Sequence, residues 1–347
     1  MKTIENKFTE VSFTDDFSDL RAFAGDFSGK KIAIFASENL PESDAGEIKA
    51  TLKQAGGNVF FVPVGDGENC KTVENAAKLS IELDELGFSR TDVIVNLGGG
   101  TVCDLGGFVA SVYKRGLDYY NVPTTLLCAV DACIGGKTAV DFGGRKNFWG
   151  TFHHPKKAII VGSLMNKLPQ GLIDAGKSEI VKYALLDGKF GKYLTELPNE
   201  SFSESLLDII EKCLIIKGRF VAEDEFDFGE RRALNAGHTV AHAIEAESGY
   251  ATDHSTAVAL GLNEEMRIAN ACGIVSDGEY ARFGALYEKS LGKREFLPKT
   301  QLLSLVRFMK SDKKNSDGRI CFVFPTECGV KKEYLTESRL TETIKRL

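Results

Sequence analysis

Residues 93–110 read VIVNLGGGTVCDLGGFVA, and this stretch decides the fold. An apolar, β-branched run ends at Gly98, Gly99 and Gly100, and a helix is expected to begin within a few residues. Glycines at that point let the backbone approach a ligand closely, and the N–H groups of a helix start favour a phosphate or pyrophosphate. Because the loop is not a GxGxxG motif, a tight strand-to-helix turn without a ligand is the alternative.

The same rhythm of strand and helix extends on both sides of this loop. A helix is predicted over 106–116, and short β-branched runs separated by helical stretches predict further strands. The predicted strands are residues 31–36, 58–64, 91–97, 118–123 and 156–162. This alternation predicts a parallel sheet covered by helices.

After about Ser163 the pattern changes to long helical periodicities, with residues 320–325 as the only segment typical of a strand. The predicted helices are residues 170–187, 202–222, 232–248, 255–272 and 277–290. We therefore expect an α/β domain over 1–162 and a mainly helical domain over 163–347, with a functional cleft between them.

Composition excludes several classes of protein. The 347 residues carry a formal net charge of -6, which argues against a nucleic-acid or anionic-membrane surface. The first residues, MKTIENKFTE, lack a signal pattern, and no apolar run approaches the roughly 20 residues that span a bilayer. Eight cysteines form no CxxC pair, which disfavours a cysteine metal site and favours a reducing compartment. We expect a cytoplasmic protein.

A second polar segment, residues 122–147, places charged groups among small and apolar residues. A surface loop would account easily for Lys146 and Asn147. It accounts poorly for Asp131 and Lys137, because charges among apolar neighbours are costly to bury without partners. These two residues are therefore predicted to have a functional role.

Three of the five histidines lie between residues 231 and 254. The spacing of Arg231, Asn235, His238 and His242 would place all four on one stripe of a continuous helix. A solvated helix face is one interpretation. The other is a catalytic zinc site in which His238 and His242 are joined by His254 or a carboxylate, because such sites commonly use three protein ligands.

Glu179 and Lys182 are three residues apart in the segment SEIVKYALL, so they would be neighbours on one helical face. An ordinary surface ion pair is the simpler interpretation. The apolar residues that follow, together with a metal site that still needs a carboxylate, make Glu179 a candidate ligand.

These motifs together resemble the 3-dehydroquinate synthase family, within the wider group of sugar phosphate cyclases. The resemblance covers about residues 65–324, and the motifs occur in the order usual for the family. They are GENCKT, NLGGGTVCDLGGFVA, YKRG, VPTTLL, VDACIGGKT, RKN, SEIVKY, ALNAGHTVAHAIE and SDKKN. The fold implied is an α/β nucleotide-binding domain with a mostly parallel sheet, followed by a mainly helical domain for metal and substrate.

The resemblance also implies roles for individual residues. The metal, usually zinc with cobalt as the alternative, would be held by Glu179, His238 and His254, so that His242 faces the substrate instead. Residues implied in catalysis are Asp131, Lys137, Lys182, Arg231, Asn235 and His242. Further substrate contacts would be Arg115, Asn147, Lys217 and a late lysine at Lys313 or Lys314. Contacts to NAD would be Glu68, Lys71, Gly99, Gly100, Asp104, Thr124, Thr125 and Lys146.

Three positions depart from the family pattern. Ser37 and Glu38 stand near the place of an acidic residue expected to contact the adenosine ribose. His254 is followed by Ser-Thr-Ala-Val-Ala instead of Gly-Glu-Ala-Val-Ala, which changes the surroundings of the metal. Asp227 replaces a longer glutamate, which weakens any role of that residue in accepting a proton.

The activity implied is conversion of 3-deoxy-D-arabino-heptulosonate 7-phosphate to 3-dehydroquinate and phosphate, a step of the shikimate pathway, by a cytoplasmic homodimer. Another sugar phosphate cyclase, a metal-dependent polyol dehydrogenase and a non-enzymatic binding module are the rival interpretations. The number of anion-binding lysines and arginines disfavours the dehydrogenase. The density of ionisable groups on apolar elements disfavours the binding module.

Overall fold

The computed structural model describes residues 1–65, 67–310, 315, 317–327 and 329–347. The chain forms two compact units. The first comprises Met1–Ile173 with Leu206–Ala222, and the second comprises Asp174–Ser205 with Glu223–Leu347. The predicted domain division at 162/163 stays a prediction, and by its contacts the helix that begins at Leu206 groups with the first unit.

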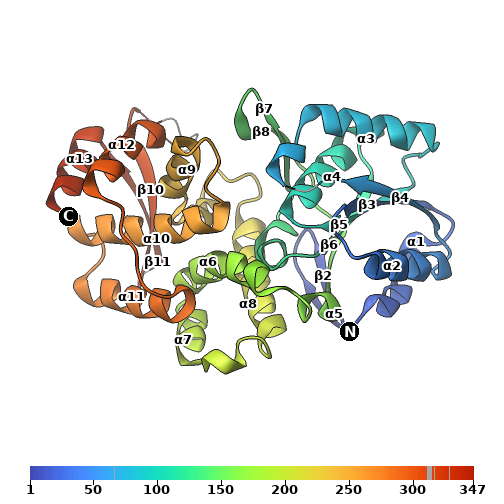
Figure 1. The fold of residues 1–347 in the computed structure, drawn as a ribbon, viewed down its shortest axis with the longest axis horizontal. Coiled ribbons are helices and arrows are strands. Elements are labelled where there is room, and N and C mark those ends of the chain that lie inside the picture. The colour runs from blue at the N-terminus through green and yellow to red at the C-terminus, as the bar shows by residue number, and fades with distance from the viewer. Residues whose placement is uncertain (66, 311–314, 316, 328) are drawn as a thin grey trace. The chain divides into compact units, whose positions relative to one another are not determined.

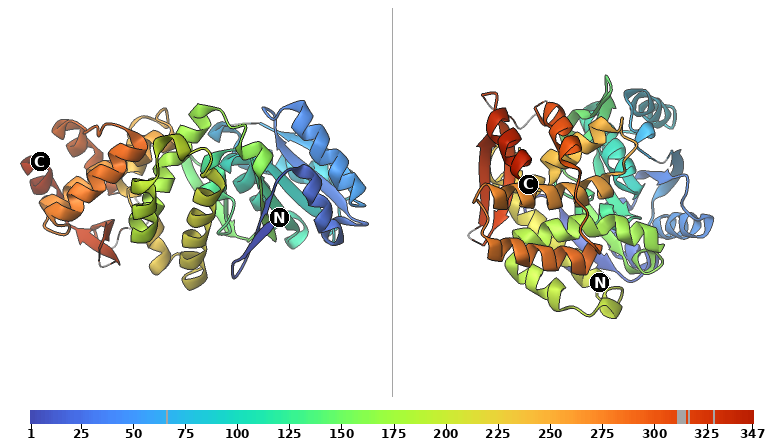
Figure 2. Two further views of the ribbon diagram at one scale, coloured as in Figure 1. Left: turned by 90° about the horizontal axis from the view of Figure 1, so that it is seen from below. Right: turned by 60° about the vertical axis from the view of Figure 1, so that its left-hand side comes forward.

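A seven-stranded sheet, in the order β1-β2-β9-β6-β5-β3-β4, organises the first unit (Figure 1). Its strands run parallel to their neighbours except for the antiparallel pair β1 and β2. Figure 2 shows this amino-terminal pair in dark blue. The strands are β1 (Lys2–Glu5), β2 (Glu10–Thr14), β3 (Lys31–Ser37), β4 (Asn58–Val64), β5 (Val93–Gly98), β6 (Asp118–Pro123) and β9 (Lys157–Val161). The five strands predicted from β-branched runs are confirmed, whereas β1 and β2 were not predicted.

Helices cover both faces of this sheet because its central strands are apolar on both faces. Every residue of β5 is buried. Phe35, Ile94, Leu105 and Val109 belong to one apolar core between the strands and two of the helices. The covering helices are α2 (Glu42–Gln54), α3 (Val73–Glu85) and α4 (Gly100–Val112).

A hairpin, several short helical segments and one long helix complete the first unit. Strands β7 (Lys137–Phe142) and β8 (Arg145–Phe152) form an antiparallel hairpin that was not predicted, because its exposed side chains show no apolar alternation. The remaining elements are η1 (Phe17–Phe23), α1 (Ala24–Phe27), η2 (Glu68–Cys70), η3 (Tyr113–Arg115), η4 (Cys128–Ala132), α5 (Gly162–Met165) and α8 (Leu206–Glu223).

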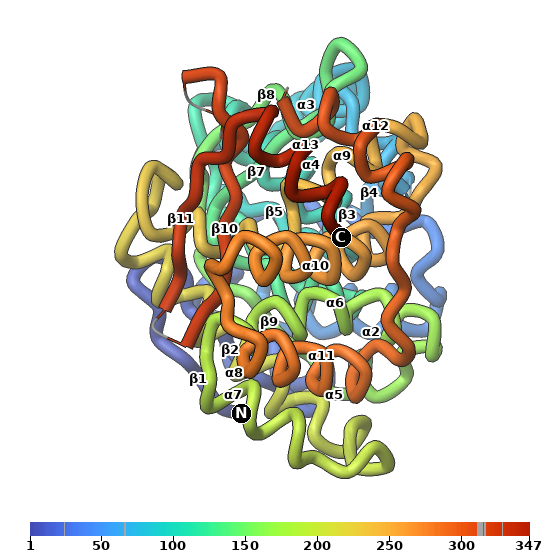
Figure 3. Tube along the Cα trace, turned by 90° about the vertical axis from the view of Figure 1, so that its left-hand side faces the viewer, coloured from blue at the N-terminus to red at the C-terminus, as the bar shows by residue number. Residues whose placement is uncertain are grey.

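The second unit is mainly helical, as predicted, and Figure 3 shows its helices with the hairpin of β10 and β11. Its helices are α6 (Gln170–Leu186), α7 (Gly188–Glu196), η5 (Asn199–Ser201), η6 (Glu230–Asn235), α9 (His238–Glu247), α10 (His254–Ala271), α11 (Asp277–Leu291), α12 (Lys299–Met309) and α13 (Glu337–Arg346). The expectation of a single strand here is wrong, because β10 (Ile320–Thr326) pairs with a second strand, β11 (Gly329–Leu335). Strand β11 was not predicted because polar side chains interrupt its pattern.

The predicted continuous helix over 232–248 is also wrong. A short 3₁₀ helix ends at Asn235, and α9 begins only at His238. Gly237 between them has a φ of 79°, in the left-handed region that a helix interior excludes. Arg231 and Asn235 therefore do not share a helical stripe with His238 and His242.

Among the described residues, no helix combines the length and apolar character needed to cross a membrane.

Candidate functional site

Helix α6 carries a buried ion pair. Glu179 is fully buried, and Lys182 is only 1% exposed. Their three-residue spacing on one helical face brings the Lys182 ammonium group into contact with the Glu179 carboxylate. The interpretation as a surface pair is wrong, because a buried charge pair of this kind is costly to desolvate and marks a candidate site.

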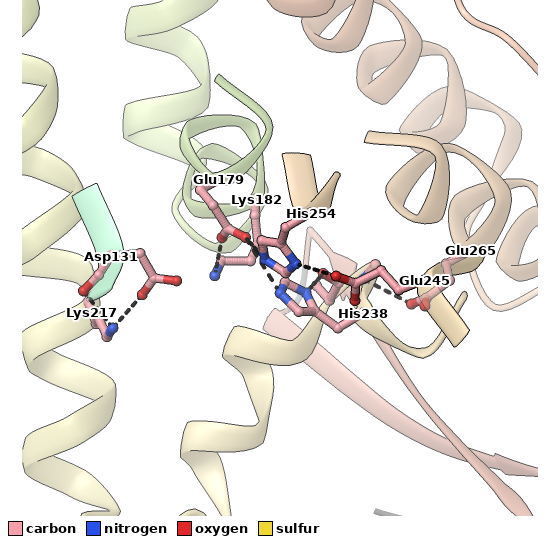
Figure 4. A network of polar contacts seen from close by, with 10 residues as sticks. Asp131, Glu179, Lys182, Lys217, His238, Glu245, His254 and Glu265 are labelled. Carbon is pink, nitrogen blue, oxygen red and sulfur yellow. Dashed lines mark hydrogen bonds and ion pairs between the residues drawn. The ribbon is translucent and has the colours of Figure 1, made fainter. Parts of the chain in front are cut away.

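Two histidines from other helices meet the same carboxylate (Figure 4). His238, the first residue of α9, places Nε2 3.5 Å from Glu179 Oε1. His254, the first residue of α10, places Nε2 3.4 Å from the same oxygen. One ligand atom from each of the three residues lies within 4.8 Å of the others.

This donor set fits a divalent metal. One carboxylate and two imidazoles are the ligands of several catalytic zinc sites. Among the described residues, neither buried oxygen of Glu179 accepts a hydrogen bond of regular geometry, and its contacts are ionic. A metal ion bound here would provide the Glu179 carboxylate with the partner that the fold does not supply through hydrogen bonds.

The electrostatics of the three groups differ. Burial lowers the pKa of His238 to about 4, so this imidazole is neutral at pH 7. Burial also lowers the pKa of His254, but its contacts with the carboxylates of Glu179 and Glu245 outweigh it and raise that pKa to about 10. Burial raises the pKa of Glu179, yet Lys182 and the two histidines hold it well below its usual value. Metal binding here would displace a proton from His254.

His242 lies outside this three-residue cluster. It is exposed, and its ring centroid lies 5.5 Å from that of His238. Arg231, in η6, is 2% exposed and donates from Nη1 to the Glu225 carbonyl at 2.5 Å. Asn235 donates to the Arg232 carbonyl at 3.2 Å. The third member of the cluster with His238 and His254 is thus Glu179 and not His242.

The glycine loop lies at the carboxyl ends of β5 and β6, two adjacent parallel strands. Gly99 precedes α4 and Gly100 is its first residue. Thr124 donates its N–H to the Gly98 carbonyl at 3.0 Å, which places Thr124 and Thr125 beside the loop. Ligands of open α/β sheets bind outside the carboxyl ends of the strands, so this edge is a candidate nucleotide site.

A charged cluster surrounds Lys71 in the same unit. Lys71 is 3% exposed, and its Nζ lies 2.5 Å from Asp104 Oδ2 on α4 and 3.9 Å from Glu68 Oε1. Burial lowers the pKa of Lys71, but the charges of Asp104 and Glu68 outweigh it and keep it raised. The predicted nucleotide contacts Glu68, Lys71 and Asp104 are therefore brought together.

Asp131 and Lys217 form a second pair in the first unit (Figure 4). Lys217, on α8, donates to the Asp131 carbonyl at 2.7 Å and also contacts the Asp131 carboxylate. Lys217 is 7% exposed, whereas Lys137 is exposed at the start of β7. The buried cation beside Asp131 is thus Lys217, which lies 86 residues away in the sequence.

The remaining predicted residues of the first unit lie in exposed turns and hairpins. Asn147, in β8, has a φ of 50° and donates its backbone N–H to Asp141 at 2.8 Å. Lys146 precedes it and is half-buried, and Arg115 is exposed with a φ of 71°. The predicted late lysine at Lys313 or Lys314 lies outside the described residues.

Sequence analysis did not identify two buried glutamates near the histidines, Glu245 and Glu265. Glu245 lies seven residues after His238 on α9, so its helical spacing was an available signal. Glu265 lies on α10, and nothing in its local sequence connects it to α9.

Comparison with known proteins identifies relatives of this chain. The family model described as "3-dehydroquinate synthase N-terminal" matches residues 61–175, and "3-dehydroquinate synthase C-terminal" matches residues 176–315. A 3-dehydroquinate synthase of Pyrococcus abyssi is 37% identical over 312 residues, covering 90% of this chain and 91% of that protein. One from Clostridium beijerinckii is 38% identical over 255 residues and 73% of both chains.

Solved structures show the same fold at lower identity. A 2-deoxy-scyllo-inosose synthase, crystallised with carbaglucose-6-phosphate, NAD+ and Co2+, has a TM-score of 0.85 at 19% identity, covering 99% of both chains. The 2-epi-5-epi-valiolone synthase of Streptomyces hygroscopicus, with NAD+ and Zn2+, has a TM-score of 0.83 at 19% identity, covering 100% of this chain and 98% of that one. Both support the predicted α/β plus helical architecture.

Proposed function

This chain belongs to the 3-dehydroquinate synthase family, and we propose that it converts 3-deoxy-D-arabino-heptulosonate 7-phosphate to 3-dehydroquinate and phosphate. The observation that carries the proposal is the cluster of Glu179, His238 and His254, in which Glu179 and His238 are buried and His254 is half-buried. Chemically, this is a phosphate-eliminating lyase that closes a carbon ring.

A divalent metal, zinc or cobalt, would be held by Glu179, His238 and His254. When bound, it would supply a Lewis acid that polarises the hydroxyl to be oxidised and the ketone that results. The protein contributes orientation, because each ligand comes from a different helix: Glu179 lies within α6, and His238 and His254 are the first residues of α9 and α10.

NAD would bind at the carboxyl edge of the sheet, where it would take a hydride from the substrate and return it later in the same turnover. The loop at Gly99 and Gly100 would approach the pyrophosphate, with Thr124 and Thr125 beside it. Lys71 would bind NAD while it remains paired with Asp104. Glu68 and Lys146 are proposed as further contacts to NAD.

The substrate carries a carboxylate and a phosphate, which need cationic groups and hydrogen-bond donors. Lys182 would orient a substrate hydroxyl beside the metal-binding carboxylate. His242, which is exposed and close to His238, would move a proton at the reacting hydroxyl. The other groups proposed to bind the substrate are Arg115, Asp131, Lys137, Asn147, Lys217, Arg231, Asn235 and Lys313.

We also propose that the protein works in the cytoplasm as a homodimer, as its resemblance to the 3-dehydroquinate synthase family implies. Light scattering of the purified chain tests the dimer. A mass of one chain at working concentration would contradict it.

The deciding experiment measures phosphate release from the heptulosonate phosphate, with and without NAD and a chelator. We expect activity that requires both NAD and metal, with no net accumulation of NADH. Steady NADH production would favour a polyol dehydrogenase. Equal turnover of sedoheptulose 7-phosphate, which lacks the carboxylate, would move the protein to another sugar phosphate cyclase activity.

A further inference from the structure

Helix α9 contributes a buried carboxylate to a histidine of the neighbouring helix. Glu245, near the end of α9, is 3% exposed, and its Oε1 lies 3.4 Å from Nδ1 of His254. Figure 4 shows Glu245 on the side of the His254 ring away from Glu179. The two ring nitrogens of His254 therefore face two different carboxylates, with Nε2 directed at Glu179.

Helix α10 contributes a buried carboxylate to the start of α9 in return. Glu265 is 1% exposed and accepts hydrogen bonds from the N–H groups of Gly237 and Val240, both at 2.9 Å. These groups flank His238, the first residue of α9. A carboxylate at a helix N-terminus is favoured by the unpaired N–H groups and by the helix dipole.

The ring of His238 depends on the same backbone segment. Its Nδ1 lies 3.0 Å from the Ala236 carbonyl, which leaves Nε2 directed at Glu179. Ala236 directly precedes Gly237, whose N–H is held by Glu265. Any shift of Glu265 would therefore move both the backbone and the ring orientation of His238.

The two helices also touch at backbone distance. A Cβ on Gly261 of α10 would lie 2.1 Å from the Gly237 carbonyl and 2.9 Å from the Ala241 nitrogen. Such close packing leaves no slack between α9 and α10. The positions of His238 and His254 relative to each other are thus fixed by this contact and by the two glutamates.

We propose that Glu245 and Glu265 are positioning residues for the metal site, an inference that rests on the proposed function. Each helix supplies one histidine ligand and the carboxylate that orients the histidine of the other helix. A ligand histidine whose second ring nitrogen donates to a fixed acceptor keeps its tautomer and ring orientation, which strengthens metal binding. For His254 that acceptor is Glu245.

The test measures the Zn²⁺ affinity of the full chain by competition with a chromophoric chelator. Losing an acceptor of this kind typically weakens metal binding by about 10–100-fold. We expect Glu245→Met to show a loss in this range. Glu245→Gln should lose less, because its amide oxygen can still accept from His254 Nδ1. Glu247→Gln is the matched control, since Glu247 lies on the same helix but bonds to Ser304.

The absorption spectrum of the Co²⁺-loaded protein separates positioning from general stability. Both Glu245→Met and Glu265→Gln should shift the Co²⁺ bands, because the ligand geometry changes, whereas Glu247→Gln should match the wild type. Thermal unfolding of the metal-free proteins shows how much of any effect is loss of fold. If Glu245→Met does not fold, Glu245→Leu, which also lacks the acceptor, decides by the same two readouts.

The outcomes distinguish this inference from the proposed function. A wild type that binds no Zn²⁺ would overturn both. A wild type that binds Zn²⁺, together with folded Glu245 variants whose affinity stays within about threefold of it, below the roughly 10–100-fold expected, would overturn the inference alone. A Glu265→Gln protein with lowered thermal stability and an unchanged Co²⁺ spectrum would show that Glu265 only stabilises the fold.

Discussion

Asp92 in the first unit and Glu179 in the second are both buried carboxylates, but they are held by different kinds of group. Asp92, just before β5, accepts backbone N–H groups from Lys31 at 2.8 Å and Ser89 at 2.6 Å. Glu179 contacts the side chains of Lys182, His238 and His254 instead.

The difference separates a carboxylate held by backbone N–H groups from one held by ionisable side chains. Burial raises the pKa of Asp92, but hydrogen bonds from Ser89 and Lys31 outweigh it, so the fold alone satisfies this charge. The partners of Glu179 are ionisable groups, and two of them are themselves able to bind a metal. Substitutions of the two carboxylates should therefore have different effects. The largest loss, of metal binding and activity, is expected at Glu179.

The first prediction is that Glu179→Gln abolishes metal binding and activity. The amide cannot supply an anionic ligand, so the loss of Zn²⁺ affinity should exceed the roughly 10–100-fold typical of residues that only orient a ligand. Metal content after dialysis and phosphate release check this, with circular dichroism to confirm folding. Glu196→Gln, an exposed carboxylate on α7 beside Lys192, should keep both. Full metal retention in Glu179→Gln would mean that Glu179, like Asp92, is not a metal ligand.

Arg231→Lys tests whether geometry matters beyond charge in the second unit. The buried guanidinium of Arg231 is anchored by the Glu225 carbonyl and could hold an oxyanion through two parallel hydrogen bonds, which an ammonium cannot reproduce. We expect kcat to fall on the order of 100-fold through misplacement of the substrate, with a smaller change in KM. Metal content should stay at the wild-type level. A kcat within experimental error of wild type would exclude Arg231 from the site.

Much of the fold followed from periodicity alone. Strand β4 was predicted at residues 58–64 and β6 at residues 118–123, the bounds that the structure shows, because apolar central strands leave a strong pattern. The break at Gly237 was missed because a glycine inside a helical pattern is usually tolerated. Gly237 has a left-handed φ, and a Cβ there would lie 2.7 Å from Leu262 of α10, a tertiary contact that a local pattern does not contain.

The candidate site followed less directly from the residues. Helical spacing placed His238 and His242 together and predicted both as ligands, whereas the structure groups His238 with Glu179 and His254, from two other helices. Asp131 pairs with Lys217, which lies 86 residues away, so the local sequence does not reveal this partner. These groupings depend on tertiary packing, so only the resemblance to a family could have supplied them before the structure.

Gly106→Ala should destabilise the first unit without affecting the metal site. A Cβ on Gly106, inside α4, would lie 1.8 Å from Oδ1 of Asn96, whose side chain donates to Asn121 at 2.9 Å. Overpacking of this kind costs about 1–3 kcal/mol. Gly46→Ala is the control, because Gly46 also lies inside a helix but has open space around it. That variant should gain up to about 1 kcal/mol from helix propensity.

Thermal unfolding and Zn²⁺ affinity, measured on both glycine variants, check the comparison. The expected result is a lower melting temperature for Gly106→Ala with unchanged affinity. Weakened metal binding in that variant would mean that the sheet and the histidine cluster do not respond independently.

The smallest expected effect is on the pH dependence of stability, through Asp92→Asn. The asparagine can keep one acceptor oxygen but loses the charge and one set of hydrogen bonds, which should cost about 1–2 kcal/mol at pH 7. The folded pKa of Asp92 lies below its unfolded value of about 3.9, so its contribution is fully present above that pH. It is lost as the pH falls through the lowered folded pKa, because protonation then removes the charge in both states.

The difference in melting temperature between wild type and Asp92→Asn should accordingly be constant from neutral pH to about pH 5 and shrink as the pH approaches 3. Asp118→Asn serves as the control, since Asp118 pairs only with the exposed Lys156 among the described ion pairs and should show almost no difference at any pH. Metal content should be the same in all three proteins. A difference for Asp92→Asn that grows with acidity would mean that burial, rather than the Ser89 and Lys31 N–H groups, dominates this carboxylate.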